Sequence, residues 1–259
     1  MMFYPELNPM SLFPSPTPHT YREQRKCLRP LLPYLNELRL DRDKTFAKEV
    51  ASSLGIRVPK TLRGAEGLSF VSKPNGLSGS RGVIVVVDGV VRMGSRLAGV
   101  LEEVVVDENG QIPPRDFKVY CFGYQPRIIQ VIERHPRSYA YYLPDDWSAV
   151  RGICRRRWRD QPRPACLEEL IHIGRTLSRR FHFPVRIDCY ASREGAVFGE
   201  FCLTSGISSA LTRAADRMFG EWWREHFEAL GIRNEFDPLE SPQAFHTLPS
   251  PEDLAVKVT

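Results

Sequence analysis

The sequence contains no long apolar run and no disulfide or zinc-binding pattern. No segment of its 259 residues reaches the roughly 20 apolar residues that span a bilayer, so we expect no membrane span. The first residues, MMFYPELNPM, lack the charged and then apolar order of a signal peptide. The six cysteines are scattered without a CxxC pair, which predicts reduced thiols in a cytoplasmic protein and argues against a zinc site.

The composition is that of an ordinary globular protein. Hydrophobic residues make up 42% of the chain and charged residues 26%. A chain of this length buries a sizeable core and forms one large or two small domains. The net charge of +5 is mild for a nucleic-acid binder but fits an acidic ligand.

Residues 183–206 contain the most informative pattern. Two apolar runs flank a short polar segment that includes Gly195, as expected for a β-hairpin. Each run carries one acid, Asp188 on the first and Glu200 on the second. Antiparallel strands can place two such carboxylates side by side, and Arg186 points to the same side as Asp188.

Two neighbouring carboxylates repel each other, and the burial of an unpaired charge is costly. A divalent cation between Asp188 and Glu200 removes both problems. Oxygen ligands suit Mg²⁺, which takes its other ligands from water and substrate phosphates, and Arg186 adds a positive charge for the same phosphates. The alternative is a pair of solvated acids on an edge hairpin, with Arg186 as their ion-pair partner.

A second pattern consists of a strand, a loop rich in Gly and Ser, and another strand. Residues 68–71 and 83–87 favour strands, and the loop at 74–82 offers many backbone N–H groups that can bind an anion. Lys73 adds a point charge at the root of this loop. The loop is not a P-loop, because GK[ST] is absent and no helix follows. A plain glycine-rich hairpin turn is the alternative.

Periodicity predicts the remaining elements. Residues 43–54 read as an amphipathic helix in which Phe46, Val50 and Leu54 recur on one face, and Gly55 follows as its C-cap. Further helices are predicted at residues 164–180 and 217–230, and further strands at residues 90–93, 101–106, 116–122 and 127–133. Residues 139–147 are aromatic and end near the acidic pair Asp145 and Asp146.

One segment is strongly basic. Residues 151–163 carry six arginines around Trp158: Arg151, Arg155, Arg156, Arg157, Arg159 and Arg163. Basic residues around an aromatic ring can bind nucleic acid, an acidic glycan or a phosphate-rich surface. A solvated loop is the simpler interpretation.

Five stretches, taken in order, resemble the ATP-grasp superfamily and most closely its TupA-like branch. They are DKTFAKEVASSLGIRVP, SKPNGLSGSRG, LEEVVV, DFKVYCFG and PVRIDCYASREGAVFGEF. The resemblance implies an α+β, ATP-grasp fold in which two α+β subdomains grip ATP between antiparallel sheets. It divides the chain into an N-terminal arm at 1–40 (a reduced pre-grasp region), a small subdomain with the phosphate loop at 41–103, a large subdomain with the metal site at 104–230, and a tail at 231–259.

The resemblance also implies roles for individual residues. Asp188 and Glu200 hold Mg²⁺, and Lys118 and Arg186 face the phosphates as the catalytic cations. The other residues expected at the nucleotide are two lysines, the loop over the β- and γ-phosphates, and the start of the strand that borders adenine and ribose: Lys44, Lys73, Gly76, Ser78, Gly79, Ser80, Gly82, Glu102 and Glu103.

This sequence departs from the family at one position that matters. The second metal strand usually carries Glu, any residue and then Asn, or resembles Glu-Leu-Thr in the TupA-like branch. Here it is Glu200-Phe201-Cys202. Cysteine is a poor ligand for a hard cation, so we expect Glu200 alone, water, Thr204 or Ser205 to complete the site.

The resemblance implies an enzyme that uses ATP and Mg²⁺ to join a carboxylate to an amine through an acyl phosphate. The expected partners are a small-molecule or glycan acid and an amine; an acidic sugar or amino acid of cell-surface polysaccharide synthesis is the leading candidate. The alternatives are an amino-acid or peptide ligase of specialised metabolism and a catalytically inactive nucleotide-binding module. Nucleic-acid binding is not favoured, and a homo-oligomer is compatible with the sequence.

Overall fold

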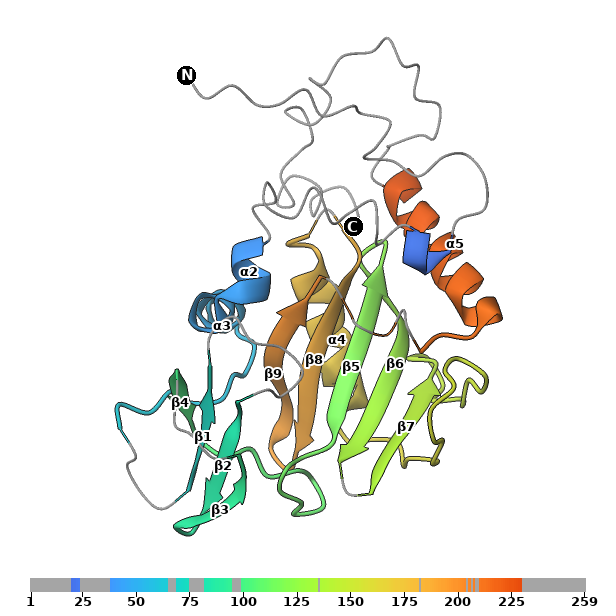
Figure 1. Cartoon of the computed structure of the whole chain (residues 1–259). Coiled ribbons are helices and arrows are strands. Elements are labelled where there is room, and N and C mark those ends of the chain that lie inside the picture. Colours follow the sequence, from blue (N-terminus) through green and yellow to red (C-terminus); the bar gives the residue numbers. More distant parts are fainter. Residues whose placement is uncertain are drawn as a thin grey trace, which may run out of the picture.

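A computed structural model of the chain describes residues 20–23, 38–64, 69–74, 82–94, 99–134, 136–181, 183–203, 205, 207 and 210–229. Within these residues the chain forms two antiparallel sheets (Figure 1). The smaller sheet has the order β3-β2-β1-β4, with β1 at Phe70–Lys73, β2 at Ile84–Val87, β3 at Val90–Met93 and β4 at Val100–Glu102. The larger sheet has the order β7-β6-β5-β8-β9, with β5 at Asp116–Phe122, β6 at Gln125–Arg134, β7 at Arg137–Tyr142, β8 at Val185–Ser192 and β9 at Gly195–Cys202.

This architecture confirms the predicted α+β fold with antiparallel sheets and the predicted hairpin, which is β8 and β9. The turn between β2 and β3 is also as expected, because Asp88 and Gly89 both have positive φ, at 50° and 76°, as a two-residue hairpin turn requires. The strand predicted at 101–106 is shorter than expected. It ends at Glu102, and residues 103–106 leave the sheet toward β5.

Side chains alternate between the two faces of the large sheet along each strand, so the two faces carry different residues. Helix α4 (Leu167–Ser178) covers one face, where it packs on β5, β6, β8 and β9 (Figure 1). The approach is close: a Cβ on Gly174 of this helix would lie 2.9 Å from the side chains of Val119 and Pro126. The opposite face, which α4 does not cover, carries the polar side chains of the same strands.

Helix α3 (Lys44–Ser53) has the predicted ends but a different buried face. The Asp43 side chain accepts a hydrogen bond from the Phe46 N–H at 3.1 Å, and Gly55 has φ of 75° just beyond the helix. The fully buried side chains are not the predicted apolar ones, which are only partly buried, but Lys44, Ala47, Lys48 and Ala51. The two alanines allow close packing on β9, and the two lysines share their face of the helix.

Each sheet has its own hydrophobic cluster. The small one consists of Phe70, Ile84 and Val86, with Leu62 and Leu101 packed against it. The large one surrounds the five-stranded sheet and includes Ala47 and Ala51 of α3. The helix that the sequence groups with the small subdomain thus shares its core with the large sheet, and the predicted subdomain boundaries stay a prediction.

Helix α5 (Arg213–Ala229) begins four residues before its predicted start at 217. Its aromatic residues pack: the Phe219 ring lies 5.6 Å from that of Tyr120 on β5, and Trp223 is 2% exposed. Tyr21 contacts both of these α5 rings, at 5.6 Å each. Among the described residues, no helix is both long enough and apolar enough to cross a membrane, and the five described cysteines are free thiols.

Candidate active site

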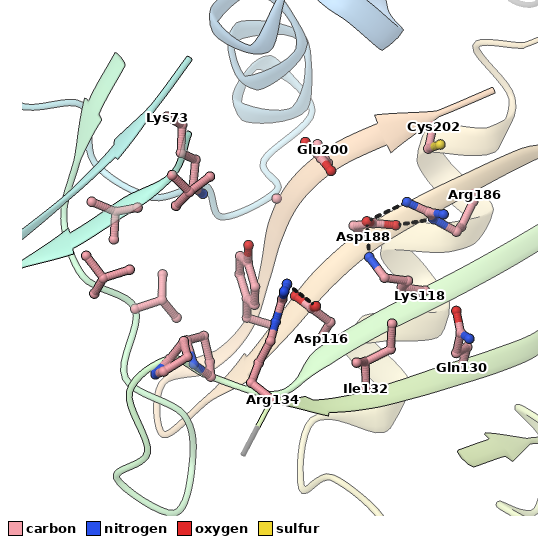
Figure 2. Close-up of a pocket in the computed structure, with 18 of the residues that line it drawn as sticks. Lys73, Asp116, Lys118, Gln130, Ile132, Arg134, Arg186, Asp188, Glu200 and Cys202 are labelled. Atoms are coloured by element: carbon pink, nitrogen blue, oxygen red, sulfur yellow. Dashed lines mark hydrogen bonds and ion pairs between the residues drawn. The ribbon is translucent and has the colours of Figure 1, made fainter. Parts of the chain in front are cut away.

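A cavity of about 320 Å³ lies between the two sheets. Figure 2 shows its polar side, where cationic and anionic side chains of β5, β6, β8 and β9 converge. Most of its apolar lining comes from the small sheet and from the segment that connects the sheets: Val71, Val83, Val85, Val104, Val105, Ile112, Pro113 and Pro114. An apolar slot beside a charged wall suits a ligand with an apolar ring at one end and charges at the other.

Asp188 is the centre of the charged wall. It is 4% exposed, and its carboxylate accepts hydrogen bonds from Arg186 Nε at 2.6 Å and Arg186 Nη2 at 2.9 Å, and also from Lys118 Nζ (Figure 2). Burial alone would raise the pKa of Asp188, but the two cations outweigh it and lower the pKa. The predicted shared side of Arg186 and Asp188 is confirmed, and Asp188 is not a solvated acid.

Glu200 lies directly opposite Asp188 in the β8–β9 register. Its side chain is 31% exposed and its Oε2 lies 3.7 Å from Lys44 Nζ. Burial, and then the negative charge of Asp188, raises the pKa of Glu200. The two facing carboxylates therefore still repel each other, and a cation placed between them would relieve that repulsion.

These two carboxylates could hold a divalent cation. Across the part of the chain that the structure describes, no group of three or more His, Cys, Asp or Glu side chains converges as a metal site. Two carboxylates without a third ligand do not form a complete cage. They fit Mg²⁺, which keeps several waters and takes phosphate oxygens as ligands.

The lysines predicted to contact the nucleotide lie at the cavity. Lys44 Nζ donates to the Pro74 carbonyl at 3.0 Å, and Lys73 Nζ lies 2.9 Å from Glu102 Oε2; both lysines line the cavity. Lys48, which the sequence analysis missed, forms a second ion pair with Glu102. Its spacing from Lys44, four residues on a helix, could have indicated that both share a face.

Glu102 and Glu103 do not line the cavity. The Glu102 side chain is 1% exposed and lies behind Lys73, while Glu103 accepts a hydrogen bond from the Lys60 N–H at 3.0 Å. Their role toward ribose stays a prediction. Of the predicted phosphate loop, Gly82 is an exposed turn residue with φ of 69°, and Gly76, Ser78, Gly79 and Ser80 lie outside the described residues.

A buried polar network supports Arg186, and the sequence analysis did not assign it. Arg186 Nη1 donates to Ser205 Oγ at 2.9 Å, and that hydroxyl lies 3.2 Å from the Tyr120 hydroxyl. Tyr120 in turn donates to Gln130 Oε1 at 3.3 Å, and Gln130 contacts the Tyr141 hydroxyl. Alternation along β5 places Tyr120 on the same face as Lys118, and this pattern could have indicated that Tyr120 faces the cavity. In this structure the Ser205 hydroxyl therefore accepts a hydrogen bond from Arg186.

Two further residues shape the cavity. Cys202 lies opposite Arg186 in the register and lines the cavity, and burial raises the pKa of its thiol to about 11. A protonated thiol is a poor ligand for Mg²⁺, as the sequence predicts. Gly199 leaves room for the Tyr190 ring: a Cβ there would lie 3.2 Å from Tyr190 Cε2.

The sequence profile of one protein family, TupA-like ATPgrasp, matches residues 93–224, just over half of the chain. Among solved structures, the chain is similar to ATP-complexed D-alanine–D-alanine ligase from Bacillus anthracis, with 16% identity and a TM-score of 0.45 over 76% of this chain and 67% of that one. It is also similar to D-alanine–D-alanine ligase from Helicobacter pylori, with 14% identity and a TM-score of 0.44 over 72% of this chain and 58% of that one.

A third similar structure is the ATP-grasp ligase PsnB complexed with its minimal precursor, with 13% identity and a TM-score of 0.44 over 74% of this chain and 62% of that one. The chain therefore spans less than two thirds of the Helicobacter ligase and of PsnB. Comparison with curated proteins finds no match.

Proposed function

Because this chain belongs to the TupA-like ATP-grasp family, we propose that it is an ATP-dependent ligase that joins a carboxylate to an amine and releases ADP and phosphate. The observation that carries the proposal is the facing pair Asp188 and Glu200 at the wall of a cavity in which basic side chains outnumber acidic ones. Transfer of a phosphoryl group needs alignment and neutralisation of charge more than covalent help from the protein. This wall offers both.

The proposed residue roles follow from position. Lys44 reaches the cavity from α3 and Lys73 from β1 of the small sheet, and both hold phosphate oxygens of the bound nucleotide. Lys118 and Arg186, fixed by Asp188, face the phosphate that is transferred. When bound at Asp188 and Glu200, Mg²⁺ would supply further charge neutralisation at the phosphates.

The proposed reaction has two steps. A carboxylate oxygen of the acid substrate attacks the γ-phosphorus of ATP, the bond to the β-phosphate oxygen breaks, and ADP leaves. The amine then attacks the acyl carbon of the acyl phosphate, phosphate leaves, and the amine nitrogen loses a proton. Arg186 and Lys118 stabilise the negative charge on the transferred group in the first step, and Ser205 keeps Arg186 in place.

The acyl phosphate has to be kept from water. We assign this task to the loop Gly76, Ser78, Gly79, Ser80 and Gly82, whose backbone N–H groups would also bind phosphate. An acidic sugar or acidic amino acid of cell-surface polysaccharide synthesis remains the proposed acid, with peptide ligation in specialised metabolism as the alternative. Because ATP is the co-substrate, we place the protein in the cytoplasm.

A second function is favoured by one observation. Cys202 stands where a metal ligand is usual, and its thiol, whose pKa is raised to about 11 by desolvation, is protonated at neutral pH. A site with a single functional metal position suits a nucleotide-binding module without turnover. The two functions differ in whether an acid and an amine accelerate ATP cleavage.

The test is a phosphate-release assay with MgATP over acids and amines, singly and in pairs. We expect release only when both an acid and an amine are present, and its loss in Glu200→Gln with the fold retained. The ligase is overturned, and the binding module supported, if the protein binds ATP but no pair of acid and amine stimulates phosphate release. In that case the rate of phosphate release should also be the same in Glu200→Gln as in the natural protein.

A further inference from the structure

The cavity holds more positive charge than its acids balance. Among the described residues, seven basic side chains line it: Lys44, Lys73, Lys118, Arg134, Arg137, Arg156 and Arg186. Three acidic side chains line it, and each has a basic partner from that set: Asp188 with Lys118 and Arg186, Glu200 with Lys44, and Asp116 with Arg134. Lys73 is paired with Glu102 behind the wall.

Arg137 and Arg156 are the two lining cations for which the described part of the chain shows no acidic partner. Both guanidinium groups lie over the ring of Tyr139, with Cζ of Arg137 at 5.6 Å and Cζ of Arg156 at 4.7 Å from the ring centroid. Tyr139 is itself 7% exposed. A buried ring thus holds two exposed cations together at the cavity.

The position of Arg156 is fixed by the backbone. The Tyr139 N–H donates to the Arg157 carbonyl at 2.9 Å, and the Arg159 N–H donates to the Tyr139 carbonyl at 3.3 Å, so this segment runs along β7. Other arginines of the basic stretch have surface partners: Arg151 with Asp160, Arg159 with Glu133 and Arg163 with Glu168. Of the six arginines in this stretch, Arg156 is the one that the described cavity lining includes.

The strand register places this pair toward the end of the large sheet that is away from Arg186. Arg137 stands opposite Arg134, whereas Arg186 stands opposite Tyr120. Arg137, Tyr139 and Tyr141 share one face of β7, and Tyr139 and Tyr141 stand opposite Ile132 and Gln130 of β6. Gln130 belongs to the network that runs through Tyr120 and Ser205 to Arg186. Between strand axes, β7 lies three strands from β8, about 14 Å at about 4.8 Å per strand. The side chains of Arg137, Arg156 and Arg186 all extend from their backbones into the cavity between these positions.

We propose that Arg137 and Arg156, held by Tyr139, bind a second anionic group of the acid substrate, several bonds away from the carboxylate that is activated. The substrate class is an acid with an additional carboxylate or phosphate. A guanidinium group binds either anion through two parallel hydrogen bonds, and a molecule with one anionic group leaves both arginines without a partner. This inference rests on the proposed ligase function and specifies its substrate.

The test is calorimetric binding of matched acids in the presence of Mg²⁺ and a non-hydrolysable ATP analogue. The anionic probes are L-glutamate, adipate and glucuronic acid 1-phosphate; their counterparts with a neutral second group are L-glutamine, adipic monoamide and glucuronic acid. We expect at least one anionic probe to bind about ten- to a hundredfold more tightly than its counterpart, as for hydrogen bonds to charged groups.

That preference should disappear in Arg137→Gln and Arg156→Gln, return in part in Arg156→Lys, and persist in the control Arg151→Gln. Affinity for the nucleotide should be the same in all variants. The inference is overturned if no anionic probe is preferred, if the preference survives in both glutamine variants, or if these variants lose nucleotide affinity instead.

Phosphate release with the same acids and an amine separates this inference from the proposed function. A binding preference that the two arginine variants abolish, without release from any pair of acid and amine, would leave the anion site standing and overturn the ligase. Release that does not distinguish an acid from its neutral counterpart would leave the ligase standing and overturn the inference.

Discussion

Asp188 and Glu200 face each other across β8 and β9, yet their surroundings move their pKa values in opposite directions. Arg186 and Lys118 bind Asp188 so closely that its pKa is lowered in spite of burial. Glu200 has Lys44 at 3.7 Å, and burial and the charge of Asp188 raise its pKa in spite of the nearby cations Lys118, Lys44 and Arg186. Asp188 is therefore part of a fixed ion-pair cluster. A bound cation would lower the pKa of Glu200 more than that of Asp188.

This difference predicts unequal effects of neutralising the two acids. Asp188→Asn leaves Arg186 and Lys118 buried without their anion and should lower the free energy of unfolding by about 3–5 kcal/mol. Glu200→Gln removes a repelled charge and should change it by less than about 1 kcal/mol. Urea unfolding of both variants measures this, and equal losses would contradict the assigned environments.

The stability of the protein should depend on Asp41 through pH. Burial raises the pKa of Asp41 above its ordinary value of 3.8, although its side chain accepts a hydrogen bond from the Leu203 N–H at 2.8 Å. A raised carboxyl pKa contributes stability that is present below the unfolded-state pKa and is lost as pH rises through the folded-state pKa. The Asn variant can keep the hydrogen bond without the charge.

Asp41→Asn should therefore gain stability relative to the natural protein as pH rises from about 4 to about 7. Urea unfolding across this range measures the difference between the two proteins. A difference that stays constant, or that shrinks with rising pH, would show that Asp41 titrates normally.

Gly199→Ala should disturb the cavity wall. The new Cβ would lie 3.0 Å from the Asp188 carbonyl and 3.2 Å from Tyr190 Cε2, so the ring has to move. We expect a loss of about 1–3 kcal/mol in unfolding free energy and weaker nucleotide binding. Gly64→Ala is the matched control, because a Cβ there meets nothing within 4 Å. Similar behaviour of the two variants would argue against tight packing at Gly199.

Ser205→Ala should separate turnover from binding. It removes the acceptor of Arg186 Nη1, and a buried charged donor left without a partner costs about 1–3 kcal/mol. Because Arg186 stays beside Asp188, we expect kcat to fall about tenfold or more, with little change in the Kd of the nucleotide. Ser138→Ala is the control, since that buried hydroxyl has no hydrogen-bond partner in the described part of the chain. An equal fall in both variants would remove the positioning role of Ser205.

Much of this fold could be predicted from local patterns. The β8–β9 hairpin, the strand at 116–122 and the ends of helix α3 follow from alternation, a turn glycine, and an N-cap aspartate with a glycine after the last turn. These signals are local, because a few neighbouring residues decide backbone conformation. The facing of Asp188 and Glu200 also follows from the hairpin, since the register of a short antiparallel pair is fixed by its turn.

Helix α3 illustrates what local patterns miss. Its apolar residues predict one buried face, but packing on β9 buries Lys44, Ala47, Lys48 and Ala51 instead. A lysine is buried when an acid from elsewhere meets it, and Glu102 comes from the small sheet. No periodicity within the helix contains that information.

The amino-acid sequence by itself determined most of the strands and helices, the pair of acids and the family, because each rests on neighbouring residues or on an ordered set of short stretches. Only the tertiary structure decided that Ser205 holds Arg186, that Lys48 reaches Glu102, and that Arg137 and Arg156 meet at Tyr139. These contacts join residues far apart in the chain. Their geometry depends on how two sheets and a helix pack, which is a property of the whole fold.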